Sequence, residues 1–535
     1  MGTQHNIGFI CTGKQCELGR ADRVAMRWIE PGTLTRHDYS FQNLDNESNR
    51  FANALIEVGF KEGDIIISFL PKTPELFFMF LGILKIKAVA GMLFSSFGDE
   101  ALLERLREAN GIVTKSNLLK KVLKILPELK KLKHIIIVDS DSHGEGKILG
   151  YRKLMRDASD HYSVPQTPAN QPSVLHYTSG STAKPKGVLH VHGSIDSQTA
   201  TATEILQIND QEIYWCTADQ GWITGTSYGI IGPWSQGVTQ VHYGGGYDPL
   251  AWFTILEREK VTIWYTAPTA LRMLMKEEDS FFNKFSLNNL KYIFSVGEPL
   301  NPEILTWSRK VLQHDIYDTW FQTETGSIMI ANRPGLPIKP GSMGKPVTGI
   351  SVSIIGDDGK NLPPGEAGHL CLKPGWPSMF ITYLNNDQVY QEKFKNGYYL
   401  TGDNAYQDEE GYFWFIGRSD DIINTSGHLV SPFEVESSLL EMPEVAESGV
   451  VGVPDSLLYE KVVAYIVLKN QYSWNRELEL KIRLHVMNRL SSIASPSEIF
   501  IVDKLPKNRS GKIMRRVLKA RYLGEDPGDI STMED

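Results

Sequence analysis

A loop rich in glycine and hydroxyl side chains stands between two apolar stretches, at residues 177–187 (Tyr-Thr-Ser-Gly-Ser-Thr-Ala-Lys-Pro-Lys-Gly). The backbone N–H groups and hydroxyls of such a turn can wrap a polyphosphate, because glycines let the main chain approach without a Cβ in the way. Lys184 and Lys186 add positive charge where phosphate oxygens would lie. The order of residues is not the Walker pattern, and a plain solvated loop is an equally good interpretation of this stretch alone.

Four further stretches combine turns with hydroxyl, carboxylate or basic side chains. Ser295–Pro299 ends a predicted strand at a turn, and Tyr317–Gly326 sets hydroxyls and two carboxylates close together. Tyr399–Asp403 precedes Gly417–Asp421, and Leu505–Lys512 places two lysines and an arginine near the end of the chain. Each of these has a plain interpretation as a turn or a surface patch. Five stretches in this order are difficult to explain by chance, so they support phosphate binding at the loop.

Composition narrows the class of protein that carries these stretches. A chain of 535 residues is too long for one core and predicts three or four folding units. The balance of 55 basic and 63 acidic residues gives a net charge of −8, which argues against a general nucleic-acid binder. The four cysteines match no zinc spacing and favour a reducing compartment. The longest apolar run, residues 76–84, is too short to span a bilayer and predicts a buried helix. We therefore expect a cytoplasmic protein without a membrane partner.

Hydrophobic periodicity predicts the elements that must position the five stretches. Strands and helices alternate over residues 41–139, which indicates a parallel, doubly wound sheet, and residues 212–266 suggest a second α/β layer. Short strands separated by Pro-Pro-Gly and Asp-Asp-Gly turns at 341–368 are typical of a small β-barrel. From Pro432 onward a compact α+β unit follows. The predicted fold is thus α/β, with two doubly wound subdomains and a small β-barrel in a large N-terminal domain and a small α+β C-terminal domain.

Taken together, the five stretches resemble those of the acyl-adenylate-forming superfamily, whose members include acyl-CoA synthetases, luciferases and peptide-synthetase adenylation domains. The resemblance runs from about residue 41 to residue 519. Residues 215–225, 264–269 and 297–302 are most similar to the AMP-forming acetyl-CoA synthetases. Such enzymes join a carboxylate to ATP, giving an acyl-adenylate and pyrophosphate, and the thiol of CoA then displaces AMP. The resemblance implies domain boundaries of 1–417 for ATP and acyl binding, 418–421 for a hinge, and 422–535 for a mobile domain with the catalytic lysine.

The resemblance also assigns roles to individual residues. ATP and AMP would be bound by Thr178, Ser179, Gly180, Ser181, Thr182, Lys186, Gly297, Glu298, Pro299, Asp318, Thr319, Trp320, Gln322, Thr323, Asp403 and Arg418. The catalytic residues would be Lys512, Thr323 and Glu324, with Glu324 as the Mg²⁺ ligand. The acyl pocket would consist of Ile223, Thr224, Val296 and Phe321, and the CoA tunnel would include Ala267 and Gly427. Asp420 would be the hinge, about which rotation exchanges Lys512 for Gly427 at one active site.

Some positions depart from the pattern that this resemblance provides. Ala183 stands where the phosphate loop often has Gly, and Leu429 where acetyl-CoA synthetases usually have Arg. Tyr459 occupies a frequent glycine position, and Met487 falls roughly where acetyl-CoA synthetases have a CoA-contacting Arg. Phe321 replaces a Trp that closes the acetate pocket. Acetate is therefore the favoured acid, while propionate, branched or medium-chain acids stay open as alternatives.

Other interpretations of the chain are also open. A regulatory protein that binds nucleotide without catalysis is the alternative from another class, and acid-dependent pyrophosphate exchange would distinguish it from an enzyme. A P-loop ATPase is disfavoured, since no Walker Lys-Ser/Thr pair follows the loop. His190 and His192 alternate along a predicted strand and have no evident third ligand, which favours structural histidines over a metal pair. The small-molecule partners implied are a carboxylic acid, ATP and CoA, and an acetyltransferase or deacetylase acting on Lys512 is a further expected partner.

Overall fold

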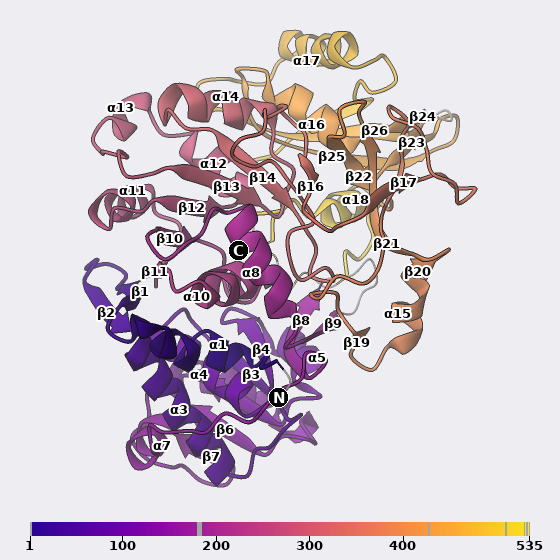
Figure 1. Ribbon diagram of the computed structural model, residues 1–535. Coiled ribbons are helices and arrows are strands. Elements are labelled where there is room, and N and C mark those ends of the chain that lie inside the picture. The colour runs from indigo at the N-terminus through magenta and orange to yellow at the C-terminus, as the bar shows by residue number, and fades with distance from the viewer. Residues whose placement is uncertain are drawn as a thin grey trace.

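The computed structural model describes residues 3–178, 185–425, 428–508, 511–528, 530 and 533, apart from the side chain of Leu429. Its N-terminal part is built on an eight-stranded sheet (Figure 1). The strand order is β19-β9-β8-β4-β3-β5-β6-β7, and neighbours from β8 to β7 run parallel. The strands are β3 (Ile65–Leu70), β4 (Val89–Phe94), β5 (Gly111–Thr114), β6 (His134–Ile137), β7 (Ile148–Gly150), β8 (Pro172–Thr178), β9 (Lys186–Val191) and β19 (Thr382–Tyr383).

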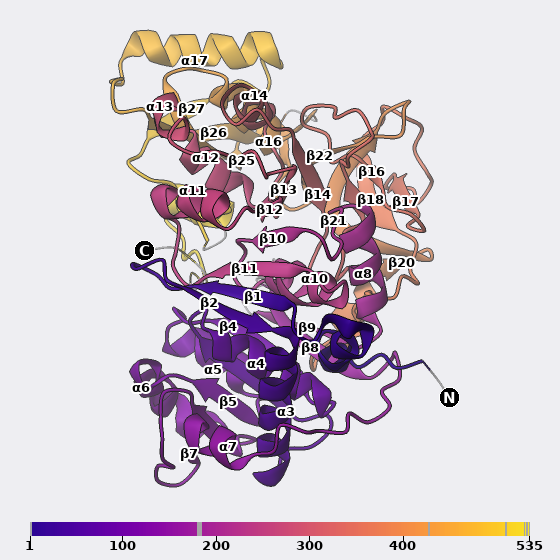
Figure 2. The ribbon, with the colours of Figure 1, turned by 60° about the vertical axis from the view of Figure 1, so that its left-hand side comes forward.

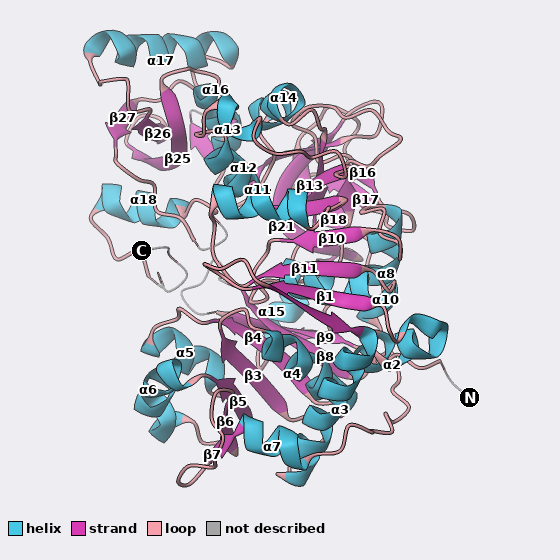
Figure 3. Cartoon of the chain, turned by 90° about the vertical axis from the view of Figure 1, so that its left-hand side faces the viewer, coloured by secondary structure: helices cyan, strands magenta, loops and turns pink. Residues whose placement is uncertain are grey.

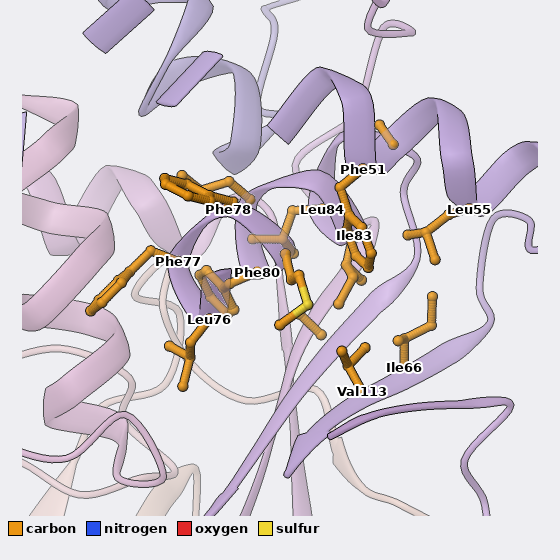
Figure 4. Packing of buried hydrophobic residues seen from close by; sticks show 14 of the residues in the cluster. Phe51, Leu55, Ile66, Leu76, Phe77, Phe78, Phe80, Ile83, Leu84 and Val113 are labelled. Atoms are coloured by element: carbon orange, nitrogen blue, oxygen red, sulfur yellow. The ribbon is translucent and has the colours of Figure 1, made fainter. Parts of the chain in front are cut away.

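Both faces of this sheet are apolar because successive strand residues point to opposite sides. Ile66 packs under one layer of helices, α3 (Phe41–Glu57), α4 (Pro74–Lys85) and α7 (Tyr151–Asp157). Ile67 packs under the other layer, α5 (Asp99–Leu106) and α6 (Ser116–Ile125). Figure 4 shows Phe51 and Leu55 of α3 and Ile83 of α4 over Ile66 and Val113 of the strands. Residues 76–85 of α4 are all buried, so the predicted buried helix is confirmed. No helix within the described residues is long and apolar enough to cross a membrane.

A nine-stranded sheet forms the second α/β layer. Its order is β16-β15-β14-β13-β12-β10-β11-β1-β2, and the six strands from β14 to β1 run parallel. The strands are β1 (Val24–Ile29), β2 (Arg36–Ser40), β10 (Ile213–Cys216), β11 (Thr239–Tyr243), β12 (Ile263–Thr266), β13 (Tyr292–Val296), β14 (Ile316–Trp320), β15 (Ile330–Ala331) and β16 (Lys345–Pro346). Its helices include α8 (Ser194–Glu204), α9 (Ile223–Thr226), α11 (Pro249–Arg258), α12 (Pro268–Leu274) and α14 (Pro302–Val311).

A five-stranded antiparallel sheet occupies the region where the sequence predicts a small β-barrel. It contains β17 (Val352–Ile355), β18 (Gly368–Leu372), β20 (Phe394–Lys395), β21 (Tyr398–Gln407) and β22 (Phe413–Arg418), and α15 (Asp387–Glu392) precedes β20. The unit after residue 422 pairs β23 (Ile423–Thr425), β24 (His428–Val430), β25 (Val445–Asp455), β26 (Tyr459–Leu468) and β27 (Glu498–Ile501). Its helices are α16 (Pro432–Leu440), α17 (Arg476–Arg489) and α18 (Arg515–Leu523).

The arrangement of these units creates the place for a site. Figures 2 and 3 show the eight-stranded sheet at the bottom, the nine-stranded sheet above it, and the C-terminal unit with α17 at the outer end. Asn301, after β13, contacts Ser437 of the C-terminal unit, and Trp320, at the end of β14, contacts Asp403 of the antiparallel sheet. The fold is therefore the predicted α/β fold with a separate small α+β unit, and the carboxyl ends of parallel strands are where such folds bind ligands.

Candidate active site

The carboxyl ends of β13 and β14 form one wall of the candidate site. The two strands are in register, with Ser295 opposite Asp318 and Val296 opposite Thr319. The Ser295 hydroxyl donates to Asp318 Oδ1 at 2.6 Å. Burial raises the pKa of Asp318 from 3.8 to about 7, although the Ser295 hydroxyl opposes the shift. Gly297 follows β13 with φ +94°, a left-handed conformation that a glycine adopts without strain.

A buried carboxylate connects this wall to the antiparallel sheet. Asp403 is 4% exposed and pairs across β21 and β22 with Arg418, whose guanidinium lies 3.2 Å from Asp403 Oδ1. The indole N–H of Trp320 and the amide of Gln322 both donate to Asp403 Oδ2 at 3.1 Å. Burial raises the pKa of Asp403, while Arg418 and then Lys512 oppose that effect. A carboxylate fixed in this way presents an acceptor to a neutral hydroxylated ligand.

The Thr323–Glu324 turn is held by residues from the first sheet. The Tyr383 hydroxyl donates to Glu324 Oε1 at 2.8 Å, and the pairing of β19 with β9 brings Tyr383 opposite Val188. His190 Nε2 lies 2.8 Å from the carbonyl oxygen of Thr323, and burial lowers the pKa of His190 to about 4. The imidazole thus supports the turn.

The second predicted histidine also has a structural contact. His192 Nδ1 accepts the backbone N–H of Ile7 at 3.0 Å. Among the residues that the structure describes, no group of three His, Cys, Asp or Glu side chains could hold a metal ion by itself. These contacts agree with the expectation that His190 and His192 are structural.

Two basic side chains lie beside the same turn. Lys186 Nζ is 5.5 Å from the centroid of the Tyr383 ring. Burial lowers the pKa of Lys393, and the carboxylate of Glu324 opposes this by favouring the charged ammonium. Neither Tyr383 nor Lys393 was predicted from the sequence, because β19 has two residues and no motif surrounds it. Thr178 and Lys186 face each other across β8 and β9. The predicted phosphate contacts Ser179, Gly180, Ser181 and Thr182 lie outside the described residues.

The predicted acyl pocket combines residues of three elements. Val296 ends β13 and Phe321 follows β14, and both belong to one hydrophobic cluster with Tyr228. The rings of Tyr228 and Phe321 meet edge to face with centroids 5.5 Å apart. Ile223 and Thr224 form the first turn of α9 and are each 8% exposed. The structure thus brings Val296 and Phe321 together. Ile223 and Thr224 lie on α9, which precedes Tyr228 in the sequence.

The loop that carries Lys512 lies against the second α/β layer. Thr269 of α12 contacts the carbonyl oxygen of Gly511 through its hydroxyl at 3.0 Å, and Glu298 is ion-paired with Arg272. A cavity between the units is lined by Glu298, Pro299 and Lys512, among others. The Lys512 residue is exposed to solvent. Desolvation and then Arg418 lower the pKa of Lys512, whereas Asp421 and Asp403 raise it. Lys512, Asp403 and Arg418 thus share one electrostatic environment.

The remaining predicted residues lie at the junction of the units. Ala267 is the N-terminal cap residue of α12, and Gly427 lies outside the described residues. Asp420 follows β22, and its carboxylate is 3.6 Å from Arg418 Nε. Tyr459, at a frequent glycine position, has φ +71° and is 71% exposed. Met487 lies exposed on α17.

Comparison with known proteins agrees with this architecture. A family model described as AMP-binding enzyme matches residues 14–384, and one described as AMP-binding enzyme C-terminal domain matches residues 434–512. An acetyl-coenzyme A synthetase of Bacillus subtilis is 44% identical over 99% of this chain and 93% of its own length. One from Pyrobaculum aerophilum is 37% identical over 100% of this chain and 86% of its own. The crystal structure of an anthranilate CoA ligase with anthranoyl-AMP has a TM-score of 0.89 and 28% identity, and covers 98% of each chain. On these grounds the chain belongs to the AMP-binding enzyme family, within the acyl-adenylate-forming superfamily that its motifs resemble.

Proposed function

We propose that this protein is an AMP-forming acetyl-CoA synthetase, which converts acetate, ATP and CoA to acetyl-CoA, AMP and pyrophosphate. The observation that carries the proposal is that three separate parts of the chain meet: the turn at 322–324 contacts Asp403, Asp403 pairs with Arg418, and the Lys512 loop lies on Thr269 and lines a cavity with Glu298. The names of the similar acetyl-coenzyme A synthetases support acetate as the acid.

The nucleotide would lie along the ends of β13 and β14. Gly297–Pro299 and Asp318–Trp320 would line the adenine, and Asp403 would accept hydrogen bonds from the ribose hydroxyls. Trp320, Gln322 and Arg418 hold that carboxylate, so its orientation does not depend on the ligand. The residues 178–186 would hold the β- and γ-phosphates, with Lys186 at one end of the loop. Thr323 would donate a hydrogen bond to the α-phosphate.

In the first half-reaction, a carboxylate oxygen attacks the α-phosphorus and the bond to the bridging oxygen breaks, which releases pyrophosphate. Lys512 would stabilise the charge on the α-phosphate and carboxylate oxygens in the transition state. Glu324 fits as a Mg²⁺ ligand, because Mg²⁺ is usually bound by one or two carboxylates together with substrate phosphates. Tyr383 donates to one oxygen of the Glu324 carboxylate and so orients it. When bound, Mg²⁺ would reduce the repulsion between the carboxylate and the phosphates.

In the second half-reaction, the thiolate of CoA attacks the carbonyl carbon of the acyl-adenylate, and AMP leaves. The C-terminal unit would rotate about Asp420, withdraw Lys512 and bring Gly427 toward a tunnel that includes Ala267. The domain boundaries 1–417, 418–421 and 422–535 follow from this proposal. Acetylation of Lys512 by a partner enzyme would remove its charge and stop only the first half-reaction.

The acyl group would lie against Ile223, Thr224, Val296 and Phe321. The edge of Phe321 against Tyr228 restricts the space available, which suits a short alkyl chain. We expect acetate to be the best substrate and propionate to be tolerated.

A panel of carboxylic acids, assayed for pyrophosphate exchange and for AMP formation with and without CoA, tests the proposal. We expect acetate to support exchange without CoA and rapid AMP formation only with CoA. ATP binding without exchange for any acid would identify a nucleotide-binding protein that lacks catalysis. Exchange with a medium-chain acid in preference to acetate would retain the enzyme class and refute the assigned acid.

A further inference from the structure

One carboxylate links the loop of the catalytic lysine to the N-terminal layers. Glu447 Oε1 lies 2.7 Å from Lys276 Nζ, and Glu447 Oε2 lies 2.6 Å from Lys507 Nζ. Lys276 follows α12 in the second α/β layer, whereas Glu447 belongs to β25 of the C-terminal unit. The side chains of Glu447 and Lys507 are 13% and 15% exposed, and that of Lys276 is 50% exposed. Glu447 therefore bridges the two parts of the chain.

The local structure directs Glu447 toward this junction. The register between β25 and β26 shifts between Val445 and Glu447. Such an irregularity re-aims the side chain that follows it. Burial acts to raise the pKa of Glu447, but Lys507 and Lys276 outweigh it, so the pKa is lowered. The carboxyl group is thus an anion at neutral pH, shared by two cations that face it from different elements.

Lys507 is coupled to Lys512 by backbone contacts of residues 507 and 508 with residues 512 and 513. Residues Lys507 and Ile513 form a bridge, and the N–H of Asn508 donates to the carbonyl oxygen of Lys512 at 2.8 Å. The N–H of Lys512 donates to Asn508 Oδ1 at 3.0 Å. A constraint on the position of Lys507 is therefore a constraint on the position of Lys512.

We propose that Glu447 is a positioning residue for adenylation and that Lys276 is its docking partner. The Lys276–Glu447–Lys507 cluster holds the base of the Lys512 loop against the second layer, where Lys512 lines a cavity with Glu298 and Pro299. The proposal deepens the proposed function and rests on it for its kinetic part. Because the cluster joins the two parts of the chain, it must separate when the C-terminal unit rotates for the CoA step. Removing it weakens the first half-reaction and leaves the second unaffected.

The Lys276→Ala variant tests the docking contact in single-turnover assays of the two half-reactions. For a partly exposed pair, we expect the rate of acyl-adenylate formation to fall roughly two- to fivefold, without loss in thioester formation from supplied acetyl-adenylate. The difference should shrink at high salt, because screening weakens the wild-type contact. Lys276→Arg should retain the wild-type ratio of the two rates. The control is Lys519→Ala, since Lys519 pairs with Glu460 inside the C-terminal unit at 3.1 Å and is 40% exposed.

Glu447→Gln removes the negative charge and keeps the size of the side chain. It should lower the rate of adenylation by about 10- to 100-fold and leave thioester formation unchanged, because the contacts with Lys276 and Lys507 are lost together. Hydrogen exchange provides a readout that does not depend on activity. Amides of residues 507–513 should exchange faster in Lys276→Ala and in Glu447→Gln, but not in Lys519→Ala. Unchanged exchange in these residues, or an equal loss in both half-reactions, would overturn the proposal. Wild-type protein that adenylates no acid would instead refute the proposed function, and the exchange data would still decide the positioning role.

Discussion

Gly511 is the residue at which the docking of the Lys512 loop can be blocked with the smallest change. A Cβ at this position would lie 2.1 Å from Thr269 Cγ2 and 2.4 Å from Thr269 Cβ. Both atoms are close to the backbone of α12, so they cannot move aside as the tip of a flexible side chain can. Gly511 also has φ +85°, which strains any other residue. Gly511→Ala should therefore prevent Lys512 from reaching the site while leaving its charge in place.

The overlap between the new Cβ and Thr269 determines how far adenylation falls, because this overlap exists only when the Lys512 loop is docked. Inserting a methyl group into a well-packed contact costs about 1–3 kcal/mol. At 1.36 kcal/mol for each factor of ten, the docked population and the adenylation rate should fall roughly 5- to 150-fold. The left-handed φ adds about 1–2 kcal/mol of strain to the loop whether or not it is docked. That strain lowers stability and does not distinguish between the half-reactions.

Rapid-quench measurement of both half-reactions checks this expectation. Thioester formation from supplied acetyl-adenylate should be close to wild type in Gly511→Ala. Adding Thr269→Gly removes the three Thr269 atoms nearest the new methyl group, so the double variant should recover adenylation relative to Gly511→Ala. Thr269→Gly alone is the control for the lost hydroxyl contact. Adenylation that stays at the wild-type rate in Gly511→Ala, or no recovery in the double variant, would show that this docked arrangement is not the one that reacts.

Four other variants examine the roles assigned to single residues. Lys512→Ala should reduce adenylation by ~10²–10³ and spare thioester formation, and equal losses in separate assays of the two steps would contradict its role. Asp420→Pro should spare adenylation and reduce thioester formation, since proline fixes φ at the hinge. Normal CoA-dependent turnover in this variant would exclude Asp420 as the hinge. Asp318→Asn should raise the melting temperature more at pH 8 than at pH 5. Folding raises the pKa of Asp318 from 3.8 to about 7, so the folded state holds its proton over a pH range in which the unfolded state has lost it. The stability that Asp318 contributes is therefore present below about pH 4 and is lost as pH rises to 7. The free energy of unfolding should fall by about 3 kcal/mol between pH 5 and 8. Phe321→Gly should shift preference toward longer acids in the acid panel, because each methylene that finds room contributes ~0.8 kcal/mol.

The layers of the fold could be predicted because their elements are strongly periodic. Helix α3 opens the predicted alternation of strands and helices over residues 41–139, and α4 was predicted from its continuous apolar run. Ser40 explains the start of α3, since its hydroxyl accepts the N–H of Asn43 and the two residues form a capping box. The predicted strand end at Ser295–Pro299 is confirmed, since β13 ends at Val296, directly before Gly297. These features depend on local sequence, and local sequence is sufficient to predict them.

Contacts between distant segments could not be predicted in this way. Tyr383 reaches Glu324 through a two-residue strand, and Lys393 joins the same surroundings from the end of α15. Their positions depend on the pairing of β19 with β9, for which the sequence contains no periodic signal. Lys276 lies in an ordinary turn after α12 and Glu447 in an ordinary strand, and only the docking of the C-terminal unit makes them partners. Tyr459 stands at a frequent glycine position in the sequence, but only the backbone structure shows that it adopts the left-handed conformation.

The electrostatics of the cleft explain why docking contacts remote from the chemistry are needed. Arg418 and Arg515 both disfavour the ammonium of Lys512, while Asp421 and Asp403 favour it. Asp403 is already paired with Arg418, and Asp421 lies 3.5 Å from Arg515. Each nearby anion is therefore shared with an arginine, and Lys512 enters a region whose charges are largely matched without it. The phosphates of ATP would supply the missing negative charge. Before they bind, the loop depends on Thr269 and on the Lys276–Glu447–Lys507 cluster, and we expect the loss of either contact to matter most at low ATP concentration.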